Sequence, residues 1–185
     1  HRYSSAASDV YKRQVMVMGA HYVLTASIHE NVVSNWNWIE ALIASVPIAI
    51  LVMLIVWINQ FQDAPSDAAV GKNTWVVRTA EKGEWMKLEK PLRLYKQFMI
   101  EAFVAVALVG ALSFFTDFGT VYAFMALIPL ALVWKAFKMA DEWMIKWNNP
   151  NADRQKVPYE LLLVNVSTIG IHFLTGILLA VAYIL

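Results

Sequence analysis

The chain is organised around one polar stretch that directly follows a long apolar run: Asn59-Gln-Phe-Gln-Asp63-Ala-Pro-Ser-Asp67-Ala-Ala-Val-Gly71-Lys72-Asn-Thr74-Trp-Val-Val-Arg78. Asn59, Asp63 and Asp67 follow one another at intervals of four residues, which places them on one face of a helix. Two carboxylates at that separation repel each other unless a cation lies between them, and their oxygens suit Mg²⁺, which binds substrate phosphates at the same time. Lys72 and Arg78 both suit diphosphate oxygens. The stretch therefore predicts a Mg²⁺–diphosphate site at the mouth of a helix bundle.

A plainer interpretation of the same residues is that Asp63 and Asp67 are solvated charges at the end of a membrane helix. Pro65 bears on the choice, because proline lacks an N–H donor and disfavours helical geometry in the residue before it. A helix break at this point would let Asp63 cap one piece and Pro65 start the next, which weakens the argument for a single face. The sequence leaves both interpretations open.

The composition is typical of an integral membrane protein. Of the 185 residues, 59% are hydrophobic and only 16% are charged. The net charge is +1, and no basic stripe is interleaved with aromatic residues, so nucleic acid is not an expected partner. Cysteine is absent, which excludes disulfides, thiolate metal sites and a cysteine nucleophile. The common motifs of phosphate loops, zinc proteases and serine hydrolases are also absent.

Apolar segments divide the chain into predicted membrane helices, each needing about 20 residues to cross the bilayer. Full spans are predicted at Ile39–Ile58, Gln97–Phe115, Gly119–Trp134 and Tyr159–Leu185. Val15–Ala26 is apolar but shorter, and is interpreted as the end of a truncated helix. The predicted fold class is therefore all-α, a multi-pass transmembrane bundle with four full helices and one truncated helix.

The polar segments between these spans carry weaker signals. Trp75–Arg78 fits a strand, a short helix or a loop, and Gly71 is a predicted helix terminator. Glu81–Tyr95 mixes charged and apolar residues, which predicts a surface helix that lies along the membrane or caps the bundle. Thr116–Gly119 predicts a tight turn, and Lys135–Pro158 a polar loop with a solvated charged face that could also help cap the site.

Residues His1–Gln14 differ in character from the rest of the chain. They are polar, rich in Ser and Ala, and end in basic residues, and no cleavage site follows an apolar part as in a signal peptide. We interpret them as a non-native tail, similar to translated adapter sequence at the ends of assembled sequencing reads. The domain is accordingly expected to comprise residues 15–185.

The positions of the basic residues predict the topology. Outside His1–Gln14, every Lys and Arg falls within Gln60–Lys96 or Lys135–Pro158. Four alternating helices place these two segments on one side of the membrane, and the positive-inside rule assigns that side to the cytoplasm. The Asp63 and Asp67 carboxylates would then face the compartment that holds diphosphates and Mg²⁺.

The pattern Asn59-x3-Asp63-x3-Asp67-x3-Gly71-Lys72-x-Thr74-x3-Arg78, following an apolar helix that contains Pro47, resembles the second aspartate motif of the UbiA superfamily of intramembrane prenyltransferases. The resemblance extends over residues 15–185 and matches the final five membrane helices of the family. The last span, with Ser167-Thr-Ile-Gly-Ile-His172-Phe-Leu-Thr-Gly176-Ile-Leu-Leu, resembles that of the branch that prenylates 1,4-dihydroxy-2-naphthoate.

This resemblance implies transfer of a polyprenyl group from a polyprenyl diphosphate to an aromatic acceptor, with 1,4-dihydroxy-2-naphthoate of menaquinone biosynthesis as the leading candidate. It implies Mg²⁺ as cofactor, because the family's Asp-rich motifs hold Mg²⁺ ions that draw charge onto the leaving diphosphate. Asp63 and Asp67 carry over as metal ligands and, with Lys72, as catalytic residues. Asn59, Lys72 and Arg78 carry over as diphosphate-binding residues. The expected location is the bacterial inner membrane, with the lipid bilayer as a further partner.

Two departures from the family pattern matter. The first aspartate motif is missing, so we expect the chain to be the C-terminal part of a longer protein and inactive alone. The stretch Gly19-Ala-His-Tyr-Val-Leu-Thr-Ala26 is similar to a Gly-x-Tyr-Tyr-Val-Gln-Thr-Gly pattern of the menaquinone branch. Leu24 and Ala26 replace its Gln and Gly, which leaves the acceptor open.

Polar residues within the predicted spans favour structural roles. Asn165, Thr168 and His172 share related faces of the last helix, and helix–helix hydrogen bonds are the preferred interpretation over catalysis. Glu101 is expected at the interface, where it either snorkels toward the polar region or pairs with Lys96 or Lys90.

The competing functional class is a multi-pass transporter or assembly protein in which Asp63 and Asp67 bind a cation. Transporters tend to place ionisable groups near the bilayer midplane on broken helices. The predicted position of both carboxylates at the membrane surface, beside basic residues, favours phosphate chemistry.

The topology gives a first testable prediction. A reporter that is active only in the cytoplasm should give no signal when fused after Leu185, because an odd number of predicted spans separates that end from each basic segment. The same reporter inserted into the Asn148–Asn151 loop should be active. A cytoplasmic signal from the fusion at residue 185 would overturn the assignment.

Overall fold

The structure is a computed structural model that describes residues 38–80, 87–153 and 156–185. The interpretations of His1–Gln14, of the truncated helix Val15–Ala26 and of the Gly19–Ala26 motif therefore concern residues outside the described ranges.

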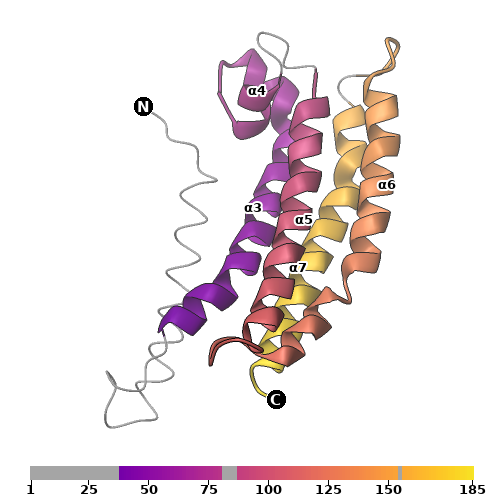
Figure 1. The fold of residues 1–185 in the computed structure, drawn as a ribbon. Coiled ribbons are helices and arrows are strands. Elements are labelled where there is room, and N and C mark those ends of the chain that lie inside the picture. The colour runs from indigo at the N-terminus through magenta and orange to yellow at the C-terminus, as the bar shows by residue number, and fades with distance from the viewer. Residues whose placement is uncertain (1–37, 81–86, 154–155) are drawn as a thin grey trace.

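The described residues form an all-α bundle, which confirms the predicted fold class (Figure 1). Its elements in chain order are α3 (Trp38–Ala69), α4 (Trp75–Thr79), α5 (Glu89–Leu112), the 3₁₀ helix η1 (Val121–Leu127), α6 (Leu130–Trp147), the 3₁₀ helix η2 (Val157–Leu161) and α7 (Leu162–Ala182). Four helical segments are long and apolar enough to cross a membrane, namely Ile39–Ala69, Glu89–Leu112, Val121–Trp147 and Val157–Ala182. The protein is therefore a membrane-embedded helix bundle.

The helices extend further into the polar segments than predicted. α5 begins at Glu89, so Glu89–Tyr95 is the first part of a membrane helix and not a separate surface helix. Pro91 is tolerated there because the first turn of a helix has N–H groups without intrahelical partners. For Glu89–Tyr95 the prediction of a surface helix was wrong, because Pro91, Leu92 and Tyr95 are buried and pack into the bundle. The first part of that predicted helix, residues 81–86, lies outside the described ranges.

The predicted polar loop after Trp134 is also helical, up to Trp147. Its buried residues recur at helical spacing: Ala136, Ala140, Trp143, Met144 and Trp147. The charged residues of this part face outward, which gives it low average hydropathy although one face is apolar. The described charged residues here, among them Asp141, Glu142 and Lys146, are exposed, as expected for a solvated face; Arg154 lies outside the described ranges.

The core is rich in aromatic side chains near the end of the bundle that carries α4. Trp57, Phe61, Tyr95 and Trp147 are essentially fully buried. The ring of Phe61 meets that of Trp143 edge-on at 5.9 Å, and Trp143 stacks on Trp147 at 5.4 Å. These contacts pack the last turns of α3 against α6, so the end of α3 is held firmly.

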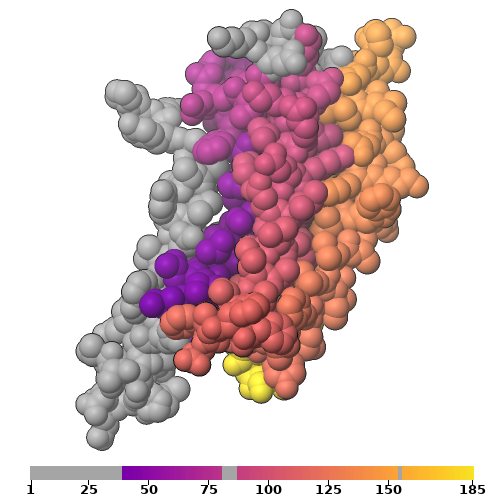
Figure 2. Space-filling model, viewed as in Figure 1, coloured from indigo at the N-terminus to yellow at the C-terminus, as the bar shows by residue number. Residues whose placement is uncertain are grey.

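The helix order brings the two basic segments to one end. α4 and the connection between α6 and η2 lie at the same end of the bundle, whereas the C-terminus and the turn after α5 lie at the opposite end (Figure 1). This arrangement agrees with the predicted alternation of spans. On the face shown in Figure 2, α5 lies between α3 and α6, and the ribbon in Figure 1 shows α7 behind α5 and α6. Outward-facing Ile100, Val104 and Leu108 of α5 give this surface the apolar character that lipid requires.

The connection from α5 to η1 is the tight turn that the sequence predicts. The Thr116 hydroxyl donates to Leu112 O at 2.9 Å and accepts from Phe118 N at 3.2 Å. Gly119 has a φ of +82°, and a Cβ atom at this position would lie 2.3 Å from Val109 O. Glycine is required here for both reasons, because a side chain would be strained and would collide with backbone.

Replacement of Gly119 by Ala should therefore lower the free energy of unfolding by about 1–3 kcal/mol. Gly170→Ala is a matched control, since a Cβ atom there meets nothing within 4 Å and α7 is already helical. Thermal unfolding in detergent micelles, followed by circular dichroism, makes the comparison. Equal midpoints for the two variants would contradict the role assigned to the turn.

Candidate functional site

The four-residue spacing of the motif is realised on one continuous helix, α3. It runs through Pro65 to Ala69, so the break considered for Pro65 does not occur. Pro65 has no N–H group to donate to the carbonyl of Phe61 one turn earlier. Phe61 and Ala64 are nevertheless fully buried, and their packing outweighs the local preference of proline. Asn59, Asp63 and Asp67 thus lie on successive turns of one face, as the first interpretation of the motif requires.

α3 ends in a Schellman motif, which confirms Gly71 as the helix terminator. Lys72 N donates to Asp67 O at 2.8 Å and Gly71 N donates to Ala68 O at 3.1 Å. Gly71 has a φ of +68°, the left-handed conformation that this motif needs. The turn reverses the chain, so the residue after Gly71 comes back over the last turn of α3.

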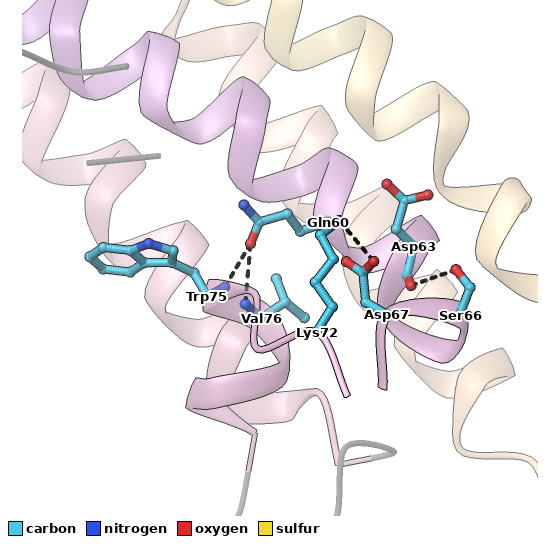
Figure 3. Close-up of polar contacts among 7 residues, drawn as sticks. All are labelled: Gln60, Asp63, Ser66, Asp67, Lys72, Trp75 and Val76. Atoms are coloured by element: carbon cyan, nitrogen blue, oxygen red, sulfur yellow. Dashed lines mark hydrogen bonds and ion pairs between the residues drawn. The ribbon is translucent and has the colours of Figure 1, made fainter. Parts of the chain in front are cut away.

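The reversal brings Lys72 onto Asp67. Lys72 Nζ lies 2.9 Å from Asp67 Oδ1 (Figure 3). The Asp67 side chain is only 9% exposed, whereas that of Lys72 is 56% exposed. Asp67 Oδ2 is buried and has no hydrogen-bond partner within the described ranges. A buried carboxylate oxygen without a partner is costly, so it is suited to receive a ligand that carries positive charge.

Asp63 occupies a different environment one turn earlier. Its side chain is exposed, while its carbonyl accepts a hydrogen bond from the Ser66 hydroxyl at 2.9 Å (Figure 3). Both carboxylates lie in the last turns of α3, at the negative end of the helix dipole, where a cation is stabilising. The part of the chain that the structure describes holds no group of three or more His, Cys, Asp or Glu side chains that could enclose a metal ion. A metal bound here would take its remaining ligands from water or from a phosphate, as Mg²⁺ does.

Asn59 is joined to α7 rather than to the carboxylates. Asn165 Nδ2 donates to Asn59 Oδ1, and one turn along α7 the Thr168 hydroxyl meets Tyr95 OH of α5 at 2.6 Å. The prediction that Asn165 and Thr168 form helix–helix hydrogen bonds is thereby confirmed. These two contacts tie α3, α5 and α7 together beside the site.

Arg78 lies apart from the Asp67–Lys72 pair. Arg78 is exposed and lines a pocket with Trp75 and Thr79, so the structure does not bring it to Asp67. Its role in diphosphate binding stays a prediction.

Glu101 accepts from Gln97 Nε2 at 2.8 Å, not from a lysine. Lys96 instead pairs with Asp141 of α6 at 2.5 Å and lies over the Phe137 ring. The ion pair expected with Lys96 or Lys90 is therefore not formed, and residues five apart on a helix, such as 96 and 101, point in different directions. The expected position of Glu101 at the interface stays a prediction.

Gln60 is a structural residue of the site that sequence reasoning missed. It is 8% exposed, and its Oε1 accepts from Trp75 N at 2.9 Å and from Val76 N at 3.3 Å (Figure 3). It thereby satisfies the first free N–H groups of α4 and fixes this short helix on α3. The only signal in the sequence is an amide at the end of the apolar run, which does not reveal a partner 15 residues away.

Removal of this amide should loosen α4 without unfolding the bundle. In Gln60→Leu, the Trp75 and Val76 amides lose a buried acceptor, at a cost of about 1–3 kcal/mol. Their hydrogen exchange should become about tenfold to a hundredfold faster. Gln97→Leu on the exposed face of α5 is the control and should leave exchange in residues 72–80 unchanged. The role of Gln60 fails if both variants exchange at the wild-type rate.

Comparison of the chain with protein-family models, with curated proteins and with solved structures finds no match. The functional interpretation therefore depends on the motif residues and on the geometry described above.

Proposed function

We propose that the protein is a Mg²⁺-dependent intramembrane prenyltransferase that transfers a polyprenyl group from a polyprenyl diphosphate to an aromatic acceptor. The leading acceptor is 1,4-dihydroxy-2-naphthoate, in menaquinone biosynthesis. The observation that carries the proposal is the buried Asp67 Oδ2, which has no partner among the described residues and lies beside Lys72 at the polar end of a membrane helix.

The donor set suits Mg²⁺ better than a softer metal. It consists of carboxylate oxygens, which hard cations prefer, and the chain has no thiolate to offer. Asp67 supplies an inner, buried oxygen and Asp63 an outer one on the preceding turn. Two carboxylates leave several coordination positions open, which suits a cation that arrives with a diphosphate.

The residues of the site then have distinct tasks. Asp63 and Asp67 hold the cation, and Lys72 supplies a positive charge to the diphosphate oxygens. Asn165 keeps Asn59 fixed on the same face of α3, one turn before Asp63. Mg²⁺, when bound, offsets the negative charge that develops on the leaving diphosphate.

The membrane setting supports a polyprenyl substrate. The spans are apolar and expose large apolar side chains to lipid, so a polyprenyl tail could lie in the bilayer while its diphosphate reaches the polar end. Most of the described basic residues lie toward that end, whereas Lys135 and Lys138 are exposed on α6 within the span Val121–Trp147. By the positive-inside rule we propose that this end faces the cytoplasm, in a bacterial inner membrane.

The proposal predicts that binding of a short polyprenyl diphosphate requires both Mg²⁺ and Asp67. Farnesyl diphosphate, titrated calorimetrically into the purified protein in micelles, should bind with Mg²⁺ and not with EDTA. Asp67→Asn should weaken binding by about a hundredfold, the loss of roughly 2–3 kcal/mol expected for a charged ligand.

Asp117→Asn is the matched control, because Asp117 is an exposed carboxylate in the turn at the opposite end of the bundle. It should bind as the wild type does. Unchanged binding by a folded Asp67→Asn protein would reject the proposal. A cation site that requires Asp67 but is indifferent to diphosphate would favour the transporter class.

A further inference from the structure

The end of α3 carries a buried carboxylate that has to be stabilised even when no ligand is bound. Asp67 is about nine-tenths buried and sits at the negative end of the α3 dipole, one turn from a second carboxylate, Asp63. Burial of an unpaired carboxylate at such a position is strongly unfavourable. The substrate-free protein therefore needs a cation of its own at Asp67.

The backbone at the end of α3 places Lys72 next to Asp67. The same Schellman motif that ends α3 bonds Lys72 N to Asp67 O, and the lysine side chain reaches Asp67 Oδ1. Main chain and side chain of one residue thus both contact Asp67. The motif depends on the left-handed conformation of Gly71, where a Cβ atom would meet nothing within 4 Å, so the glycine serves the chain reversal and not close packing.

The two partners differ in their freedom to move. More than half of the Lys72 side-chain surface is exposed, so its ammonium can leave Asp67 without disturbing the core. Asp67 cannot follow, because it belongs to a helix held by the buried Phe61 and Ala64. Asp67 is a fixed anion, and Lys72 is an exchangeable cation.

We infer that Lys72 is the counter-cation of Asp67 in the substrate-free protein. A divalent cation that arrives with a diphosphate displaces the Lys72 ammonium from the Asp67 carboxylate. This inference rests on the proposed function. Lys72 and the divalent cation compete for the same carboxylate, so the metal alone binds weakly. A diphosphate gives the displaced ammonium a new anionic partner, so metal and diphosphate favour each other's binding.

We expect the substitution Lys72→Gln to raise the affinity for Mg²⁺ alone and to lower the affinity for a diphosphate. In Lys72→Gln, Mg²⁺ alone should bind about threefold to tenfold more tightly, because the ammonium that competes with it for Asp67 is gone. Methylene diphosphonate, a stable diphosphate analogue, should bind about tenfold more weakly in saturating Mg²⁺, because the ammonium that contacts it is gone. Calorimetric titration of the full chain in micelles measures both.

Three further proteins complete the experiment. Lys72→Arg keeps a cation at the position and should bind Mg²⁺ alone as weakly as the wild type. Lys138→Gln removes an exposed lysine of α6 and should change neither affinity. Asp67→Asn should abolish Mg²⁺ binding. Circular dichroism verifies that each variant is folded.

The outcomes separate this inference from the proposed function. If Asp67→Asn abolishes Mg²⁺ binding but Lys72→Gln weakens it or leaves it unchanged, the counter-cation role is wrong and the metal site stands. If folded Asp67→Asn binds Mg²⁺ as the wild type does, the proposed function and the inference both fail. Tighter metal binding together with weaker diphosphonate binding in Lys72→Gln supports the exchange.

Discussion

The charge of the buried Asp67 carboxylate is the constraint on which the rest of the site depends. It lies at the end of α3 where the helix dipole is negative, and one of its oxygens has no partner among the described residues. The surrounding structure keeps this carboxylate in place. Phe61 packs on Trp143 of α6, and the Schellman motif at Gly71 returns Lys72 to the last turn of α3. A fixed anion beside a movable cation is an arrangement suited to the exchange of ligands.

The neighbouring helices limit how far this site can relax. Asn165 bonds Asn59 of α3, and Thr168 bonds Tyr95 of α5, so two successive turns of α7 contact both helices that flank the site. Such bonds between membrane helices contribute only about 0.6 kcal/mol each on average. Their value here lies in orientation, because a site that aligns a diphosphate needs side chains held in place more than it needs extra stability. Gln60 has the same effect on α4.

The sequence allowed the prediction of the helical bundle and of the turn residues, because apolar length and glycine placement are local signals. Gly71 and the Thr116–Gly119 turn behave as expected. The extent of α6 could not be predicted from hydropathy, since an amphipathic helix that leaves the bilayer has the average polarity of a loop. The continuity of α3 through Pro65 depends on burial of Phe61 and Ala64, which local propensity does not contain.

Part of the candidate site could also be predicted from the sequence, because residue spacing on a helix is a local signal. The helical spacing places Asp63 and Asp67 on one face, and it is realised in α3. The difference between a buried Asp67 and an exposed Asp63 arises from packing and has no counterpart in the spacing. The partners Gln60 and Trp75 are brought together by a chain reversal, so only the folded structure reveals them.

If the site works as proposed, the buried carboxylate of Asp67 is a ligand of a divalent cation. Pulsed electron paramagnetic resonance on protein loaded with Mn²⁺ and methylene diphosphonate, with ¹³C in the aspartate carboxyl groups, tests it most directly, because Mn²⁺ accepts the oxygen ligands that Mg²⁺ prefers. We expect carbon and phosphorus couplings to the metal in the wild type, and loss of both in Asp67→Asn, because Asp63 alone does not hold the metal. A carbon coupling of wild-type size in folded Asp67→Asn protein would contradict it.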